Sequence, residues 1–486
     1  MKSIKYIIST LILTAAYSQD VFNGYTLFTP VSGGGPGGGS NNNSTTYLVD
    51  INEQTVNSWN HTNGPASMPY LTQDSLLIYP YRVSNPTMDT GGVGGGISIY
   101  DWNGNLIWDY TLSDNTFQHH HDIQPLPNGN ILVLAWHRKY SSEAYDMGRQ
   151  SITNSLNQMW SESILEIEPK FDTGGHEVVW EWHLWDHLVQ DVSPTYSATY
   201  GEIADHPELM DINWGTVGGG GGPGGANADW RHHNAIDYHP GFDQIVISSR
   251  HGDEIMIIDH STTTEEAASH SGGNSGMGGD FLYRWGNPQS YDRGTSSWHK
   301  LADQHSVNWI DPGLPGEGNL ILYNNNYTNS QAAVFELELP VDESGHYTIE
   351  DGQPFGPVNT YWQESGTWQS DMQGGAFRQP NGNTLITDCD SGRILEIDND
   401  GTILWNYYPT GADFIARAEK YTLDYLNPSI PGDINGDEIV NILDIVSTVN
   451  IILGINDYNS NADLNNDTIV NILDIVLLVN IILGIR

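Results

Sequence analysis

Histidines recur at one place in successive repeats of the chain, shortly before a turn and a hydrophobic strand. They are His121, His232 and His305, and Arg250 ends the strand that follows His232. A guanidinium presents a planar fork of donors that fits two oxygens of an oxyanion. Three imidazoles and one guanidinium together make a cationic site in a chain of negative net charge, which predicts that an anion binds there.

The same histidines leave alternatives open. Three imidazoles with an open position also suit Zn²⁺ or Mn²⁺, although a neighbouring guanidinium disfavours a metal. His119 and His120 adjoin His121, and the sequence alone does not decide which of the three faces the site. Strand alternation predicts that the neighbours of the site histidines, including His233 and His251, point away from the site.

The elements that must position these residues are β-hairpins. Residues 97–108 combine an alternating strand, an Asn-Gly turn and a second strand, and residues 394–405 repeat this pattern. Most copies are followed by a second module of Asn-Gly-Asn and a hydrophobic strand. Six such units, starting near residues 46, 97, 163, 254, 332 and 393, predict an all-β fold, a six-bladed β-propeller.

A propeller accounts for the convergence of the histidines. The strand nearest the axis of each blade lines the central channel, so one residue per blade at one height forms a ring. The last unit lacks a clear Asn-Gly-Asn module, and we expect the early strand at residues 24–29 to complete it and close the ring. Glycine-rich stretches at residues 33–44, 91–96 and 218–225 are predicted to be loops.

The composition limits the partners and the compartment. The 486 residues include 17 Lys and Arg against 60 Asp and Glu, a net charge of −43, which disfavours nucleic acid as a partner. Residues 1–18 have the basic start, apolar stretch and small-residue cleavage site of a signal peptide, and no later stretch is long enough to span a membrane.

Cys389 is the single cysteine, so no intrachain disulfide forms, and its acidic neighbours disfavour a nucleophilic thiol. His183 and His187 have i, i+4 spacing but lack a third ligand.

Two copies of a 12-residue loop lie near the C-terminus. Each places oxygen side chains at positions 1, 3, 5, 9 and 12 and a backbone carbonyl at position 7, which is the ligand pattern of a calcium loop. An apolar helix follows each loop. The predicted Ca²⁺ ligands are Asp433, Asn435, Asp437, Ile439, Asn441 and Asp444 in the first loop and Asp463, Asn465, Asp467, Ile469, Asn471 and Asp474 in the second.

This C-terminal segment resembles a type I dockerin. Both helices end in Ile-Ile-Leu-Gly, and Asp at position 12 replaces the Glu of an EF-hand, which fits the dockerin pattern. The resemblance implies that calcium holds the module folded and that the module docks onto a cohesin-bearing protein.

Residues 46–410 resemble the bacterial arylsulfate sulfotransferases. In this family a six-bladed propeller moves a sulfuryl group from a phenolic sulfate to a phenol through a sulfated histidine, without a nucleotide donor. The resemblance implies that His305 is the sulfated residue and that His121, His232 and Arg250 hold the sulfate. The chain departs from periplasmic members in lacking a cysteine pair near the site. The motifs that carry the resemblance are His121-Asp122 before Pro-Asn-Gly-Asn, Asp229-Trp-Arg-His232-His-Asn234, Ser249-Arg250, residues 259–268 and Gln304-His305.

We therefore expect a secreted enzyme, periplasmic, extracellular or attached to the cell surface. Its expected parts are a signal peptide at residues 1–18, a propeller at residues 19–426 and a small α-helical calcium-loop domain at residues 427–486. A protonated His121 or His232 would act as general acid and then as general base. Trp230, Trp309 and Tyr323 are candidates to stack a phenol ring.

Two other functions remain possible for the same residues. A metal-dependent polysaccharide lyase or hydrolase would use the histidines as ligands. An anion-binding or sulfated-glycan-binding propeller would bind without turnover.

Overall fold

The computed structural model describes residues 20–32, 43–218, 225–328, 331–426, 432–435, 439–456, 459–465 and 469–483. The chain divides into two compact units. One comprises Met1–Leu71 and Leu77–Lys420, and the other comprises Thr72–Leu76 and Tyr421–Arg486. The predicted signal peptide, most of the glycine-rich stretches 33–44 and 218–225, and the predicted calcium ligands Asp437 and Asp467 lie outside the described residues.

Among the described residues, six four-stranded sheets make up most of the larger unit and form a six-bladed β-propeller. Five sheets take their strands in chain order, with antiparallel neighbours. Sheet by sheet, the strands are β4 (Tyr70–Leu71), β5 (Leu77–Arg82), β6 (Gly95–Tyr100) and β7 (Leu106–Thr111); β8 (Phe117–Pro125), β9 (Ile131–Tyr140), β10 (Gln158–Lys170) and β11 (Gly175–His183); β15 (His233–His239), β16 (Gln244–Ser249), β17 (Glu254–Asp259) and β18 (Tyr283–Trp285); β19 (His305–Trp309), β20 (Leu320–Thr328), β21 (Gln331–Leu337) and β22 (Trp362–Glu364); and β23 (Gly375–Arg378), β24 (Thr384–Asp388), β25 (Arg393–Ile397) and β26 (Ile403–Tyr407).

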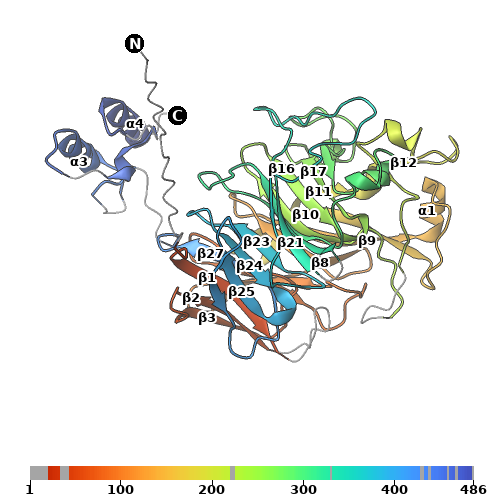
Figure 1. The fold of residues 1–486 in the computed structure, drawn as a ribbon, viewed down its shortest axis with the longest axis horizontal. Coiled ribbons are helices and arrows are strands. Elements are labelled where there is room, and N and C mark those ends of the chain that lie inside the picture. Colours follow the sequence, from red (N-terminus) through yellow and green to blue (C-terminus); the bar gives the residue numbers. More distant parts are fainter. Residues whose placement is uncertain are drawn as a thin grey trace, which may run out of the picture. The chain divides into compact units, whose positions relative to one another are not determined.

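The remaining sheet joins the two ends of the propeller. Its order is β27 (Phe414–Thr422), β1 (Gly24–Val31), β2 (Ser44–Val49) and β3 (Thr55–His61). Figure 1 shows β1, in red, beside the blue β27. Strand β1 therefore supplies the strand that the last sequence unit lacks, as predicted, and this pairing closes the ring.

The six predicted units begin at the third strand of each sheet. Their expected starts near residues 46, 97, 163, 254, 332 and 393 fall in β2, β6, β10, β17, β21 and β25. The Asn-Gly-Asn modules lead into second strands, such as β9 and β24. The sequence pattern thus follows the blades, and the residues before each module occupy the first strand of the next sheet.

The outer hairpins are set by local turn chemistry. Asp101 Oδ1 accepts hydrogen bonds from the backbone N–H of Asn103 and Asn105, at 2.9 and 2.8 Å. Asp398 Oδ1 does the same for Asp400 and Thr402, at 3.0 and 2.8 Å. The carboxylate thereby satisfies the turn's backbone donors, which is why the Asp-x-x-Gly sequence recurs between the third and fourth strands.

The core lies between neighbouring sheets. Every residue of β16 and β17 is buried, whereas the outer strand β26 consists of exposed and half-buried residues. Large side chains such as Trp136 and Trp182 are fully buried in one cluster that spans two blades. Each such side chain contributes about 1.5–3 kcal/mol by leaving water, so the stacked blades form a firm frame for the channel.

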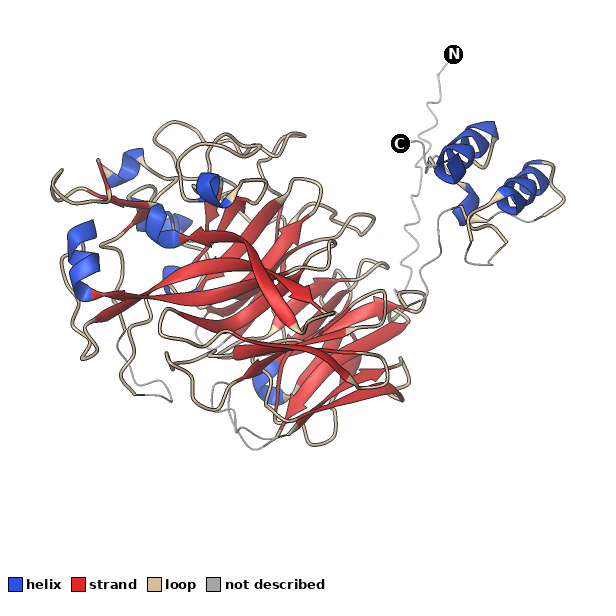
Figure 2. Ribbon diagram, turned by 180° about the vertical axis from the view of Figure 1, so that it is seen from behind, coloured by secondary structure: helices blue, strands red, loops and turns tan. Residues whose placement is uncertain are grey.

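Within the described part of the larger unit, the helices are short and lie in the connections between strands, as Figure 2 shows. They are α1 (Ser141–Met147), α2 (Thr264–Ala267) and the single turns η1 (Leu184–Asp186), η2 (Ile203–Asp205), η3 (Arg250–Gly252), η4 (Pro288–Tyr291), η5 (Ser296–Trp298) and η6 (Cys389–Ser391). A long connection between β11 and β15 also carries a small parallel sheet of β12 (Leu188–Gln190), β13 (Thr199–Tyr200) and β14 (Met210–Asp211).

The smaller unit contains the predicted C-terminal helices. They are α3 (Ile442–Ile452) and α4 (Ile472–Leu483), with the short η7 (Ser460–Ala462) between them. Both predicted helices are present, but each begins at position 10 of its predicted calcium loop rather than after the loop. Among the described residues, no helix is both long and apolar enough to cross a membrane.

Candidate active site

The first strands of three successive sheets bring the predicted histidines together. His121 lies on β8, His232 directly precedes β15, and His305 begins β19. The ring centroids of His121 and His232 are 4.4 Å apart, with the planes at 75°. Of the three adjacent histidines, His121 is therefore the one that faces the other site residues. His119 instead accepts a hydrogen bond from the Gly95 backbone N–H at 2.9 Å.

A break in the strand register accompanies each site histidine. The ladders shift between His119 and Ile123, between His233 and Ala235, and between His305 and Asn308. Backbone φ is +51° at His121, +55° at His232 and +55° at Ser306, which follows His305. Left-handed backbone at such residues costs about 1–3 kcal/mol, and bulges of this kind re-aim a side chain. The sequence pattern gave no sign of these bulges.

A glycine segment covers His121. The Gly92 carbonyl accepts a hydrogen bond from the His121 backbone N–H at 2.6 Å. A Cβ atom at Gly92 would lie 1.8 Å from His121 Nε2, and Gly92 also has a φ of +78°. Part of the predicted loop 91–96 is thus a fixed wall of the site, and Gly95 and Gly96 belong to strand β6.

His305 has a defined tautomer. Its Nδ1 lies 2.8 Å from Asn325 Oδ1, while Asn325 Nδ2 donates to the carbonyls of Ser370 and Gln373, both at 2.8 Å. Those two bonds fix which end of the amide is oxygen, so His305 Nδ1 must be the donor. Nε2 therefore carries a lone pair, which is the requirement for a nucleophile.

His121 and His232 have a different kind of partner. His232 Nδ1 lies 2.5 Å from Asp229 Oδ2. His121 Nδ1 lies 2.9 Å from His120 Nδ1, and His120 Nε2 lies 2.9 Å from Glu162 Oε2. Both site histidines are thus linked to a buried carboxyl group rather than to an amide.

The pKa values of the site histidines are low. Burial first, and then the charge on Arg250, lowers the pKa of His305 to about 3. Burial and neighbouring positive charges also lower the pKa of His121 and of His232 well below their usual range. All three are neutral at pH 7, which does not fit our expectation of a protonated His121 or His232. Neutral imidazoles can still donate from N–H and accept at the other nitrogen.

The two carboxyl groups complete this neutral arrangement. Burial raises the pKa of Glu162 well above its usual range, and burial also raises the pKa of Asp229. Burial favours the protonated form of Asp229, and in that form Asp229 donates to His232 Nδ1, which leaves an N–H at His232 Nε2. The site then presents a lone pair at His305 and an N–H donor at His232.

Arg250 begins η3 and lies within electrostatic reach of all three histidines. Its Nη2 forms an ion pair with Asp303 Oδ1 at 2.7 Å, and its side chain is 24% exposed. One edge of the guanidinium is thus occupied, and the remaining donors can meet an oxyanion.

Arg417 is a site residue that sequence reasoning missed. It lies on β27, the first strand of the closing sheet, and its Nη2 pairs with Asp122 Oδ1 and contacts Tyr70 OH at 3.3 Å. Its charge also contributes to the low pKa of His305. The signal that could have found it is position, because β27 takes the place in its sheet that β8 and β19 take in theirs.

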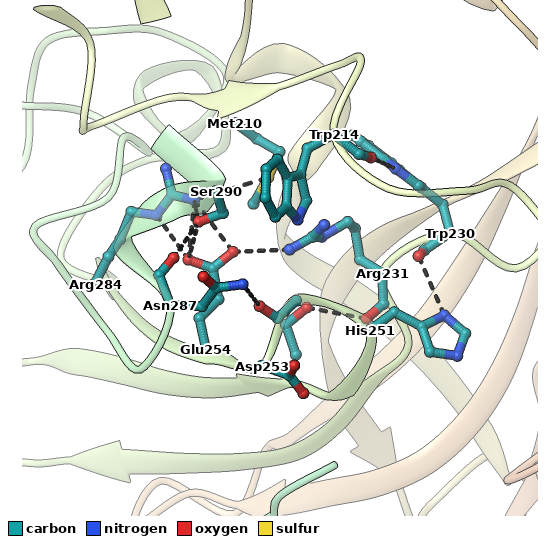
Figure 3. A network of polar contacts seen from close by, with 12 residues as sticks. Met210, Trp214, Trp230, Arg231, His251, Asp253, Glu254, Arg284, Asn287 and Ser290 are labelled. Atoms are coloured by element: carbon teal, nitrogen blue, oxygen red, sulfur yellow. Dashed lines mark hydrogen bonds and ion pairs between the residues drawn. The ribbon is translucent and has the colours of Figure 1, made fainter. Parts of the chain in front are cut away.

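A buried ionic network supports the segment between His232 and Arg250. Figure 3 shows Glu254 between two arginines: Arg231 Nη2 lies 2.7 Å from Oε1, and Arg284 Nε lies 3.0 Å from Oε2. All three side chains are fully buried.

His251 Nδ1 contacts the Trp230 carbonyl at 3.2 Å in Figure 3, and its ring stacks on His232 at 4.7 Å between centroids. His251 thus lies against the site rather than pointing away as predicted.

Several other residues that the sequence suggested for the site are buried or bonded elsewhere in the structure. Trp230, Trp309 and Tyr323 are buried at 1%, 6% and 0% exposure in the hydrophobic core, so they pack blades. Cys389 is buried, and burial raises the pKa of its thiol. His183 forms hydrogen bonds with Ser163 and Glu181. Among the described residues, it is not part of the cluster of possible metal ligands that contains His187.

Two groups among the described residues bring three possible metal ligands within 4.8 Å of one another. They are His187, His270 and Asp280, and Asp229, His232 and His251. The trio His121, His232 and His305 is not such a group. The arrangement that the metal alternative required is therefore not formed by these described residues.

The C-terminal loops have the donor chemistry of calcium sites. Asp444, at position 12, accepts hydrogen bonds from the backbone N–H of Ile434, Asn435 and Asn441 at 2.8, 3.1 and 2.8 Å. Asp474 makes the same three contacts in the second loop, at 2.9, 3.3 and 2.8 Å. Both loops are shaped alike around a buried carboxylate, and their oxygen-rich donors fit Ca²⁺.

Comparisons with known proteins identify both parts of the chain. The family model of arylsulfotransferase (ASST) matches residues 87–386, more than half of the chain. The model of the type I dockerin domain matches residues 431–483.

No curated protein matches the chain. A solved protein of unknown function from Bacteroides caccae is similar at 10% identity over 81% of this chain and 98% of its own, with a TM-score of 0.40. The periplasmic gluconolactonase of Pseudomonas aeruginosa is similar at 11% identity over 82% of this chain and 99% of its own, with a TM-score of 0.40. Structural similarity at this level carries no information about activity.

Proposed function

The chain belongs to the arylsulfotransferase family, and we propose that it moves a sulfuryl group from a phenolic sulfate ester to a phenol through a sulfohistidine at His305, without a nucleotide donor. The family match confirms the predicted resemblance and the enzyme class. The observation that carries the proposal is the His305–Asn325 hydrogen bond, which directs the Nδ1 proton to the amide and leaves Nε2 as nucleophile.

The reaction consists of two balanced transfers. In the first, the Nε2 lone pair attacks sulfur, an N–S bond forms and the S–O bond to the donor phenol breaks. In the second, the oxygen of the acceptor phenol attacks the same sulfur, the N–S bond breaks, and the proton of the acceptor phenol replaces the one that the departing donor phenoxide took up. His305 regains its lone pair, so the enzyme returns to its starting state.

Charge on the sulfuryl oxygens needs donors that are already in position. Arg250 supplies a guanidinium, and the N–H at Nε2 of His121 and His232 supplies neutral donors. This division of roles follows from the hydrogen-bonding partners, since an amide oxygen accepts from His305 whereas a carboxylic acid donates toward the other two.

Intact-mass measurement after brief mixing with 4-nitrophenyl sulfate tests the proposal. We expect a labile addition of one sulfuryl group, a burst of nitrophenol, and turnover when phenol is added. His305→Gln should lose the adduct and the turnover by roughly 10⁴-fold or more, as expected for loss of a nucleophile. His346→Gln, at an exposed histidine, is the matched control. An adduct that persists in His305→Gln would rule out His305 as the carrier.

For the C-terminal part we propose a calcium-loaded docking module at residues 427–486, joined to a propeller domain at residues 19–426. The dockerin match and the two alike loops support this proposal. Asp433, Asn435, Asn441 and their counterparts in the second loop would hold Ca²⁺, which supplies the charge that keeps the carboxylates together. A cohesin-bearing protein is the proposed partner, and an extracellular or cell-surface location follows from such docking.

A further inference from the structure

We propose that His120 and Glu162 form a buried proton relay behind His121, which carries a proton to the leaving phenoxide and takes one from the incoming phenol. This inference rests on the proposed function and extends it to two residues that no family motif in this chain assigns. The sequence indicated His120 only as a neighbour of His121, and Glu162 lies on β10, the third strand of its sheet.

The contacts form one unbroken line. His121 Nδ1 lies 2.9 Å from His120 Nδ1, and His120 Nε2 lies 2.9 Å from Glu162 Oε2. The side chains of His120 and Glu162 are fully buried. His120 is also held in place by stacking on Trp136, at 4.2 Å between centroids and 14° between planes.

Glu162 is the proton store at the inner end. Its Oε1 accepts the backbone N–H of His233 at 3.0 Å, so Oε2 is the oxygen that faces His120. Burial raises the pKa of Glu162 well above its usual range, which favours the protonated form that the relay requires. The charged and titratable groups around it are His120 on β8, Asp229 and Arg231 before β15, His233 on β15 and His251 in η3.

Each proton movement in the relay balances. When the donor phenoxide leaves, it takes the proton from His121 Nε2, His121 Nδ1 takes the proton of His120 Nδ1, and His120 Nε2 takes the proton of Glu162. Glu162 becomes a carboxylate, and both imidazoles stay neutral. The acceptor phenol reverses each transfer and returns the proton to Glu162.

The relay explains why neutral histidines can serve as acid and base. Burial lowers the pKa of His120 to about 3 and keeps His121 from becoming a stable imidazolium. A chain of neutral imidazoles avoids that charged state because each ring gains one proton as it gives up another. The buried carboxyl group takes the charge instead.

Donors with different leaving groups test the relay. The leaving 4-nitrophenolate is stabilised as an anion, whereas plain phenol has a pKa of about 10 and needs a proton. Glu162→Gln should reduce kcat/KM for phenyl sulfate by roughly 10²-fold and leave kcat/KM for 4-nitrophenyl sulfate nearly unchanged. Equal losses with both donors, or no loss with either, would overturn the relay.

Glu166→Gln is the matched control. Glu166 lies on the same strand, and its Oε2 contacts His260 Nε2 at 3.0 Å, so the same amide replaces a carboxyl that also faces a histidine. We expect both donors to keep their wild-type rates in this variant. The sulfuryl adduct formed from 4-nitrophenyl sulfate separates the relay from the proposed function. If the wild type forms no adduct, the proposed function is wrong. If the wild type and Glu162→Gln both form it, the rates with phenyl sulfate test the relay alone.

If the Glu162 variant does not fold, a measurement on the wild type still tests the relay. In mixtures of H₂O and D₂O, several protons in flight give a curved dependence of the phenyl sulfate rate on the deuterium fraction. We expect such a curve. A straight line would indicate one moving proton and would overturn the relay.

Discussion

Two glutamate–histidine pairs lie on one strand of the propeller and behave in opposite ways. Glu162 and Glu166 both belong to β10, and Oε2 of each is within hydrogen-bond distance of a histidine Nε2. Glu162 Oε2 lies 2.9 Å from His120, and Glu166 Oε2 lies 3.0 Å from His260. Burial favours the neutral forms of the first pair, because it raises the pKa of Glu162 and lowers that of His120. The second is an ion pair, with the pKa of His260 raised to about 9.

The number of carboxylates and the burial account for the difference. Burial by itself lowers the pKa of His260, but hydrogen bonds to Asp243 and Glu166 outweigh it. His260 is also 12% exposed, whereas His120 is fully buried and has a hydrogen bond to a single carboxyl group, that of Glu162. One acid per buried base favours neutral partners, and two acids around a partly exposed base favour charges.

This comparison shows where the propeller uses charge. Near the anion site the imidazoles are neutral, and Arg250 supplies the positive charge among the predicted site residues. Away from the site, a histidine becomes a structural cation. In our proposal, the same residue types on one strand therefore serve proton transfer in one place and stability in another.

The largest effect on this comparison is expected at Arg250. Arg250→Lys keeps one positive charge but loses the planar fork, so we expect turnover to fall by roughly 10²-fold with little change in melting temperature. Steady-state kinetics with 4-nitrophenyl sulfate and phenol measure the loss. An equal loss of folding would identify Arg250 as a structural partner of Asp303 instead.

A smaller effect, on stability alone, is expected at His260. Its pKa is about 9 in the folded protein and about 6.5 in the unfolded chain, so its contribution is complete below pH 6.5 and disappears as the pH rises through 9. His260→Gln should lower the free energy of unfolding by about 2 kcal/mol at pH 6 and by far less at pH 10. Denaturant titrations at both pH values measure this.

Turnover is the check on the His260 variant. If His260 is structural, the rate per folded molecule stays at the wild-type value. A large loss of turnover in His260→Gln would remove the distinction between the two pairs on β10.

Much of the fold was predictable because it depends on local rules. The hairpin at residues 97–108 carries its own Asp and Gly turn residues, and periodic repetition of that unit gives six blades without knowledge of distant contacts. The inward position of His121, His232 and His305 followed from the same repeat. The identity of the family followed from short motifs around these residues.

The parts that were missed depend on long-range contacts. Arg417 reaches the site only because β27 pairs with β1 at the opposite end of the chain. The partner of His305 is Asn325, on the second strand of its sheet, and nothing in a Gln-His motif indicates an amide there. The low pKa values depend on burial, which the sequence of His119, His120 and His121 does not express.

The C-terminal loops provide a third setting for buried carboxylates. Asp444 and Asp474 are fully buried like Glu162, but each accepts hydrogen bonds from three backbone N–H groups rather than contacting an imidazole. Such a group suits a divalent cation, whereas Glu162 suits a proton. The two regions should therefore respond differently when metal is removed.

The smallest effect on catalysis is expected from chelation. With EDTA, several carboxylates in one small loop repel each other, so the full chain should lose the helical signal of α3 and α4 in circular dichroism and lose binding to a cohesin-bearing protein. Sulfuryl transfer should continue at its original rate, because the nucleophile, the donors and the proton path in the propeller are imidazole, guanidinium and carboxyl groups. A rate that falls with EDTA and returns with Zn²⁺ or Mn²⁺ would contradict this and would indicate a metal at the propeller histidines. Because both readouts come from one sample, loss of docking with retained transfer also shows that EDTA has acted, so an unchanged rate cannot be attributed to incomplete chelation.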